Sequence, residues 1–113
     1  MKHKVKVTVI KKECYEDLQE KYLATPKAGP CDRFEVGEEF IFDGFGGPPE
    51  FWTKNGKPRC TEVWDCISRY VYAALQGGSI MEGWTNDESM MIACCNDGTR
   101  PVVFKIERMD VEE

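Results

Sequence analysis

Cysteine thiols are the groups in this sequence with the widest chemistry, and there are six of them: Cys14, Cys31, Cys60, Cys66, Cys94 and Cys95. A thiolate can bind a soft metal, attack an electrophile or join a second sulfur in a disulfide. The N-terminus alternates lysine with valine and lacks the continuous apolar stretch of a signal peptide. We therefore predict a cytoplasmic protein with reduced thiols, in which metal binding, catalysis or burial accounts for the cysteines.

The cysteine spacing differs from that of a structural zinc site, where two ligands usually lie two to four residues apart. Five residues separate Cys60 from Cys66, whereas Cys94 and Cys95 are adjacent and would point to opposite faces of a strand. His3 is the single histidine. A metal site would therefore have to be assembled from cysteines that are distant in the sequence.

A cysteine nucleophile needs a base or another source of activation. His3 would serve as the base only if the N-terminal strand lay beside the thiol. Cys60 lies just before an expected helix, whose positive end would lower the pKa of the thiol. The alternative is that Cys60 is a small buried residue at the junction between a loop and this helix.

Asp97 and Arg100 flank Gly98 near the C-terminus. An aspartate beside an arginine can bind a polar ligand or transfer a proton. Alternatively, the two residues only shape a turn, because aspartate favours turn conformations. Both interpretations stay open at the level of sequence.

Hydrophobic periodicity predicts the elements that position these residues. Alternation predicts a strand over residues 4–10, with Val5, Val7 and Val9 on its buried face. Apolar residues three and four apart predict a long helix over residues 62–76, which ends at Gly77. The other expected elements are a short helix over 15–23, a strand over 35–42, and a hairpin of strands 88–95 and 101–109.

The predicted inward faces can be given residue by residue. They are Phe40 and Phe42 in the second strand, Val63, Ile67, Tyr70, Val71 and Ala74 in the long helix, and Val102, Phe104 and Ile106 in the last strand. Residues 44–59 contain four glycines and three prolines, which predicts a long loop. Its aromatic residues Phe45, Phe51 and Trp52 either fold back on the core or await a ligand.

This element order predicts a single α+β domain over residues 1–113, with a mainly antiparallel sheet, one long helix and one short helix. A sheet curled towards a barrel is the alternative. No apolar run approaches the roughly 20 residues that cross a bilayer, so we expect no membrane association. The net charge of −5 argues against a nucleic-acid partner.

Several segments resemble a family of small uncharacterised prokaryotic proteins. The most specific is residues 94–108, in which a vicinal cysteine pair precedes a glycine turn and an alternating strand. Residues 4–9, 17–18, 29–31 and 34–40 extend the resemblance over most of the chain. The family supplies no established activity, but the resemblance implies a shortlist of functional residues: Cys31, Cys60, Cys94 and Cys95.

Three of these cysteines lie at the ends of expected elements, where binding sites are usually assembled. We therefore predict that Cys31, Cys60 and Cys95 converge at one end of the sheet and that they are the ligands if a metal is bound. Cys95 is preferred because it follows the small Ala93, whereas Cys94 shares a face with apolar residues and is expected to fill the core.

The functional prediction is a binding site for a metal ion, a cofactor or a small molecule, formed by Cys31, Cys60, Cys94, Cys95, Asp97 and Arg100. A thiol-dependent or redox enzyme is one alternative, and a structural protein-interaction module is another. The sequence does not decide whether the protein is an enzyme, which cofactor it uses or how many subunits it forms.

Overall fold

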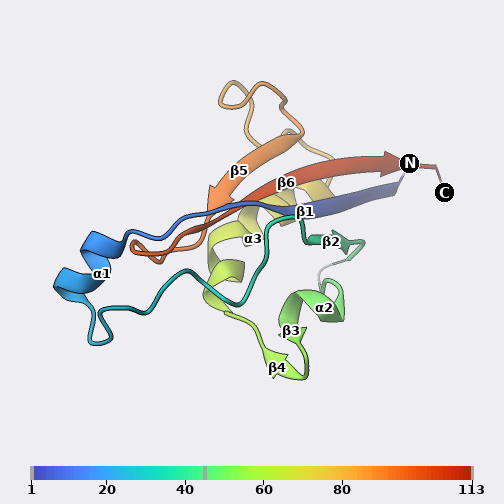
Figure 1. Ribbon diagram of the computed structural model, residues 1–113. Coiled ribbons are helices and arrows are strands. Elements are labelled where there is room, and N and C mark those ends of the chain that lie inside the picture. Colours follow the sequence, from blue (N-terminus) through green and yellow to red (C-terminus); the bar gives the residue numbers. More distant parts are fainter. Residues whose placement is uncertain (1, 45, 113) are drawn as a thin grey trace.

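The computed structural model describes residues 2–44 and 46–112. Four strands form an antiparallel sheet in the order β2-β1-β6-β5 (Figure 1). They are β1 (Lys2–Lys12), β2 (Glu39–Phe42), β5 (Met90–Cys94) and β6 (Val102–Val111). The sheet is open, with β2 and β5 at its edges, and does not close into a barrel. The predicted α+β class with an antiparallel sheet is confirmed.

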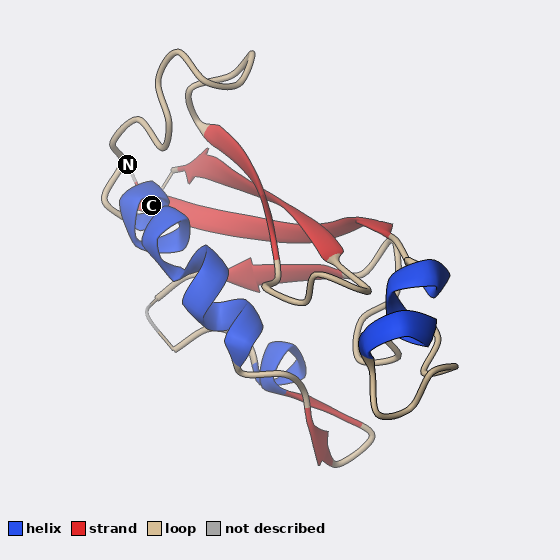
Figure 2. Ribbon diagram, turned by 90° about the vertical axis from the view of Figure 1, so that its left-hand side faces the viewer, coloured by secondary structure: helices blue, strands red, loops and turns tan. Residues whose placement is uncertain are grey.

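Helix α3 (Glu62–Leu75) lies across one face of this sheet (Figure 2). Its buried stripe consists of Val63, Ile67, Val71 and Ala74, as the spacing predicts, whereas Tyr70 is only partly buried. Two shorter helices are α1 (Glu16–Tyr22) and α2 (Pro49–Trp52). Within the described residues, no helix is long and apolar enough to span a bilayer.

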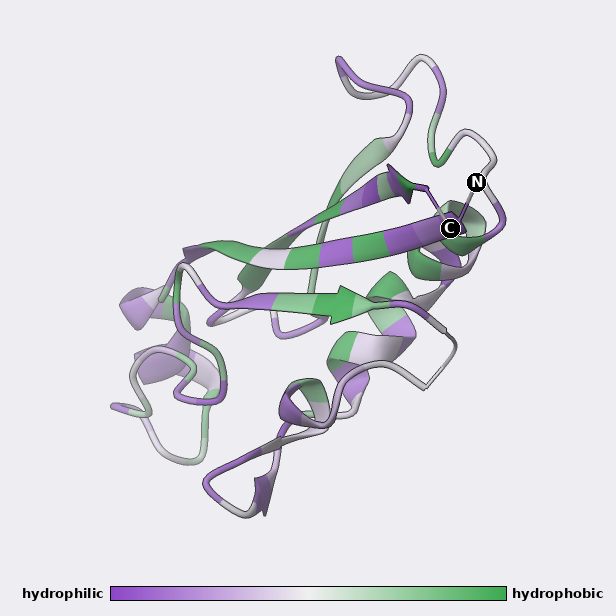
Figure 3. Ribbon diagram, turned by 90° about the vertical axis from the view of Figure 1, so that its right-hand side faces the viewer, coloured by the Kyte–Doolittle hydropathy of each residue, from purple (hydrophilic) through white to green (hydrophobic). Residues whose placement is uncertain are grey.

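The face of the sheet under α3 carries the core, and apolar and polar residues alternate along the strands (Figure 3). The predicted inward residues of β1, β2 and β6 are all buried. The expectation for β5 is wrong, because Met91 is buried whereas Ile92 and Cys94 are exposed. Cys94 therefore belongs to the open face of the sheet and is not a core residue.

The predicted loop over residues 44–59 contains α2 and a small hairpin of β3 (Thr53–Lys54) and β4 (Lys57–Pro58). Its prolines and glycines belong to these elements: Pro49 starts the short helix, where a proline is tolerated, and Gly56 helps to turn the hairpin. Phe51 is buried in the core and Trp52 packs against it, which confirms that both fold back. Phe45 lies outside the described residues.

The C-terminal end of α3 contacts both terminal strands, β1 and β6. Gly77 adopts a positive φ of 81°, and a Cβ atom at this position would collide with the imidazole of His3. Arg108 donates hydrogen bonds to the carbonyls of Gly77 and Gly78, at 2.9 and 2.6 Å. Asp110 bonds to Nδ1 of His3 at 2.6 Å. The predicted left-handed helix ending at Gly77 is therefore confirmed.

Replacing Gly77 by alanine should lower the free energy of unfolding by about 1 to 3 kcal/mol, because alanine is strained at positive φ. The new methyl group would also displace His3. Gly78→Ala is the matched control, since a Cβ there meets no atom within 4 Å and its effect should stay within about 0.5 kcal/mol. Urea denaturation of both variants measures the difference, and equal effects would contradict this role of Gly77.

Candidate thiol-lined cavity

A cavity of about 300 Å³ lies where the N-terminus of α3 meets the turn between β5 and β6. Its walls come from the segment between α1 and β2, the residues that begin α3, the β5–β6 turn and the start of β6. The lining residues are Cys31, Arg33, Phe34, Cys60, Glu62, Val63, Cys95, Asn96, Asp97, Arg100 and Val102. Five residues of the predicted site therefore line one cavity.

Backbone N–H groups hold two of the three thiols in this cavity. The amide of Arg33 donates to Sγ of Cys31 at 3.4 Å, and the amide of Val102 donates to Sγ of Cys95 at 3.3 Å. Cys60 is partly buried against the core, two residues before α3 begins. These contacts fix the positions of the Cys31 and Cys95 sulfurs in the cavity wall.

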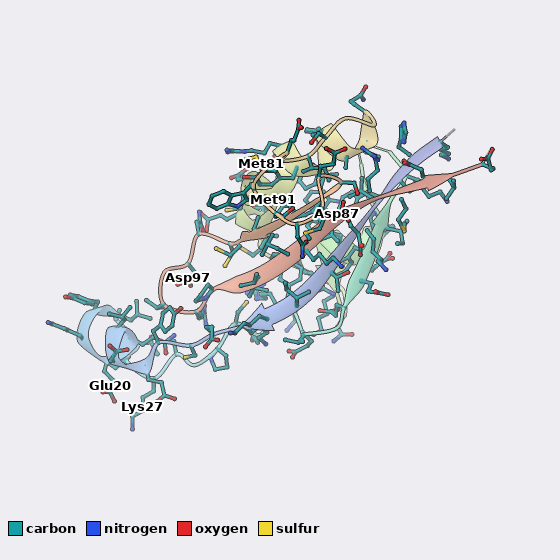
Figure 4. All side chains as sticks on the ribbon, turned by 90° about the horizontal axis from the view of Figure 1, so that it is seen from above. Glu20, Lys27, Met81, Asp87, Met91 and Asp97 are labelled. Carbon is teal, nitrogen blue, oxygen red and sulfur yellow. The ribbon has the colours of Figure 1, made fainter. Side chains whose placement is uncertain are left out.

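Asp97 lies in the β5–β6 turn (Figure 4) and is one of the residues that line the cavity. Its carboxylate accepts hydrogen bonds from the amide and hydroxyl of Thr99, at 2.9 and 3.0 Å, and from Nε of Arg100 at 3.3 Å. Burial by itself would raise the pKa of Asp97, but the hydrogen bonds from Thr99 and Arg100 outweigh burial and lower it. Asp97 is therefore an ionised, paired group that orients Arg100 beside the thiols.

Gln19 of α1 connects the segment that carries Cys31 to this turn. Its side chain is buried and forms a reciprocal pair of 3.0 Å hydrogen bonds with the backbone of Gly29. Its Nε2 also lies 3.5 Å from the hydroxyl of Thr99, which in turn bonds to Asp97. Two loop segments that line the cavity, the one between α1 and β2 and the β5–β6 turn, are thus joined through one amide side chain.

Arg59 contacts the segment between α1 and β2 that lines the cavity. Its guanidinium forms a bidentate pair with Glu38, at 2.9 and 2.8 Å, and donates to the carbonyl of Arg33 at 2.7 Å. It also lies 4.7 Å from the ring centroid of Phe34, a lining residue. The hydrogen bond from Arg59 lowers the pKa of Glu38 despite partial burial, so the pair is charged.

The remaining cysteines lie outside the cavity. Cys94 is exposed on the open face of the sheet. Burial, together with the neighbouring Cys95 and Cys94, raises the pKa of Cys66 and keeps it a neutral thiol. Cys14 lies 3.6 Å from Oε1 of Gln19. All six cysteines are free.

Among the residues that the structure describes, no group of three or more histidine, cysteine or acidic side chains could hold a metal ion. Cys31, Cys60 and Cys95 share a cavity without forming such a ligand set. His3 also lies far from the cavity. It pairs with Asp110 near the C-terminal end of β6, whereas the cavity lies at the start of that strand.

Sequence reasoning missed several residues of this site. Arg33 and Glu62 each follow a predicted cysteine by two positions, so their proximity to Cys31 and Cys60 was an available signal. Gln19 carried no signal, because a glutamine on a short polar helix is usually exposed. Its role depends on contacts with residues 10 and 80 positions away in the sequence.

Fold and cavity together define a small α+β domain with an open antiparallel sheet and a thiol-lined cavity at one end of it. No protein-family model, no curated protein and no solved structure matches this chain. The resemblance of residues 94–108 to a family of small prokaryotic proteins stays a prediction.

Proposed function

We propose that this protein binds a small polar molecule in the cavity that contains Cys31, Cys60 and Cys95. One observation carries the proposal: separate segments of the chain contribute three thiols and the charged residues Arg100 and Asp97 to the lining of one cavity. A volume of about 300 Å³ suits a small molecule rather than a peptide. A mixed lining of thiol, guanidinium and carboxylate groups favours a ligand with both donors and acceptors.

A ligand in this cavity should protect its thiols from alkylation. The probe is the small-molecule fraction of a cell extract, separated from macromolecules by ultrafiltration and added to reduced protein before iodoacetamide. If the extract supplies a ligand at about ten times its dissociation constant, alkylation of Cys31, Cys60 and Cys95 should slow about tenfold. Peptide mass spectrometry measures the rate at each cysteine.

Cys94 is the internal control, because it is exposed outside the cavity and should react at an unchanged rate. Arg100→Gln should abolish the protection, whereas Arg69→Gln on the exposed face of α3 should leave it intact. Chelator in a parallel reaction separates an organic ligand from a metal. Equal slowing at all cysteines, or no slowing in the cavity, contradicts the proposal.

A thiol-dependent redox enzyme is the second candidate, favoured by the backbone N–H donors at the sulfurs of Cys31 and Cys95. In that reaction a thiolate attacks hydrogen peroxide and displaces hydroxide, which leaves a sulfenic acid. A second thiol then attacks the sulfenic sulfur, releases water and forms a disulfide. The same alkylation experiment without extract tests this candidate, which requires one cavity thiol to react faster than Cys94.

A further inference from the structure

A second cavity, of about 430 Å³, adjoins the first and shares Arg33 with it. Its charged lining residues are Arg33, Lys54, Lys57 and Arg59, with Asp32 as the acidic one. Because the whole chain carries a net charge of −5, this concentration of positive charge is local. We call it the basic cavity.

Two lysines of the β3–β4 hairpin lie side by side in the lining of this cavity. Asn55 and Gly56 form its two-residue turn, both with positive φ, which places Lys54 directly opposite Lys57 in the ladder. Like charges directly opposite in a sheet are destabilising. A local conflict of this kind, without a compensating partner, is typical of a functional site.

The neighbouring acids leave these lysines unneutralised. Within the described residues neither Lys54 nor Lys57 forms an ion pair. The charge of Lys54 is the smallest of the causes that lower the pKa of Glu38. Glu38 is already committed to the bidentate pair with Arg59. The exposed Asp32 contacts Arg33 at 3.5 Å and leaves both lysines free to meet an anion.

Two arginines complete the basic cavity. Arg33 is oriented by a 2.8 Å hydrogen bond from its Nη1 to the carbonyl of Pro58, which fixes the hairpin beside the thiol cavity. Arg59 is 7% exposed, and its Nε has no hydrogen-bond partner among the described residues. A buried donor without a partner in a native structure can indicate an absent ion or water.

We propose that the basic cavity binds the phosphate group of a small organic molecule between Lys54 and Lys57. A phosphate monoester carries close to two negative charges near neutral pH, which matches two opposed lysines better than a single carboxylate does. Arg33 borders both cavities, so the rest of the molecule extends past it to the thiols. This extension rests on the function proposed above, whereas the anion site does not.

Titration with inorganic phosphate tests the anion site without any assumption about the organic part. Two-dimensional NMR spectra of the full chain, recorded at constant ionic strength with chloride as the reference salt, should shift at residues 53–59. Lys57→Glu should weaken phosphate binding by about tenfold or more, since it removes one charge-assisted contact and adds a repulsive charge. Lys54→Gln should weaken it less.

Lys57→Glu also separates binding from folding, because it places opposite charges across the ladder and should not lower the stability of the hairpin. Lys27→Gln is the matched control, at the α1 end of the molecule in Figure 4, and should bind phosphate as the wild type does. Unchanged binding in Lys57→Glu, or equal loss in Lys27→Gln, overturns the proposal. So does tight binding of a single-stranded oligonucleotide without binding of inorganic phosphate.

The two proposals fail in distinguishable ways. Thiol protection by cell extract without phosphate shifts at residues 53–59 overturns the anion site and leaves the thiol cavity standing. Phosphate shifts that disappear in Lys57→Glu, with no protection of Cys31, Cys60 and Cys95, support the anion site and contradict the proposed function.

Discussion

Replacing Glu38 by alanine should lower the free energy of unfolding by about 3 to 5 kcal/mol, because it leaves the buried charge of Arg59 without its partner. The side chain of Arg59 is only 5% exposed, and both of its terminal nitrogens donate hydrogen bonds to the carboxylate of Glu38. Glu38 also accepts a 2.7 Å hydrogen bond from the amide of Glu35. Urea denaturation followed by tryptophan fluorescence measures the loss.

Glu39 provides the matched control for this variant. It is the next residue, and its exposed carboxylate pairs with Lys6 at 3.6 Å on the open face of the sheet. Exposed ion pairs contribute up to about 1 kcal/mol, so Glu39→Ala should have a small effect. Similar losses in the two variants would show that the Arg59–Glu38 pair contributes no more to stability than an exposed ion pair does.

The same pair predicts a pH dependence. The hydrogen bond from Arg59 lowers the pKa of Glu38 from its ordinary value of 4.5, and the amide of Glu35 adds to this effect against burial. A carboxylate with a lowered pKa in the folded state contributes stability in full above the unfolded value. That contribution is lost as the pH falls through the folded pKa.

The pH effect of Glu38 can be isolated by comparison with Glu38→Gln, since Asp97 and Asp110 also have lowered pKa values. The difference in stability between wild type and variant should be constant at neutral pH and should shrink as the pH falls below 4.5. A difference that stays constant down to the acid transition would contradict the ion pair.

Replacing Ile67 by alanine should cost about 2 to 5 kcal/mol, because the side chain is fully buried between α3 and the sheet. Ile67→Val should cost only about 0.5 to 1.5 kcal/mol, which separates loss of volume from a general disturbance of the helix. Arg69→Ala, on the exposed face of α3, should change stability by less than about 0.5 kcal/mol. Denaturation of the three variants gives the ranking directly.

Loss of Ile67 should also affect the thiol cavity, because α3 begins with the lining residues Glu62 and Val63 and follows Cys60 by two positions. Local opening of a loosened helix exposes the thiol more often. Alkylation of Cys60 should therefore accelerate in Ile67→Ala more than alkylation of Cys94. Equal costs for Ile67→Ala and Arg69→Ala would contradict the assigned helix face.

Local sequence patterns were enough to predict the main elements and most of their buried faces. Alternating valines at Val5, Val7 and Val9 can bury one face only in a strand, and the spacing from Val63 to Ala74 can do so only in a helix. The helix ending at Gly77 also followed from local chemistry, since glycine enters the left-handed region without strain. These features depend on neighbours within a few residues.

The hairpin within residues 53–58 shows where local signals conflict. Asn55 and Gly56 are a recognised hairpin turn, but the surrounding glycines and prolines predicted a loop. The strands have only two residues each, too few to show a period. Their position was decided by contacts of Arg33 with Pro58 and of Arg59 with Trp52.

The buried face of β5 and the set of residues that line the cavity depend on long-range packing. Met90 and Ile92 are as apolar as Met91 and Ala93, so hydrophobicity did not distinguish the two faces of this strand, and the packing of α3 did. Three cysteines line one cavity because loops from distant parts of the chain are held together by Gln19 and Arg59. Such contacts depend on chain topology, since residues far apart in the sequence meet only when the strands have paired.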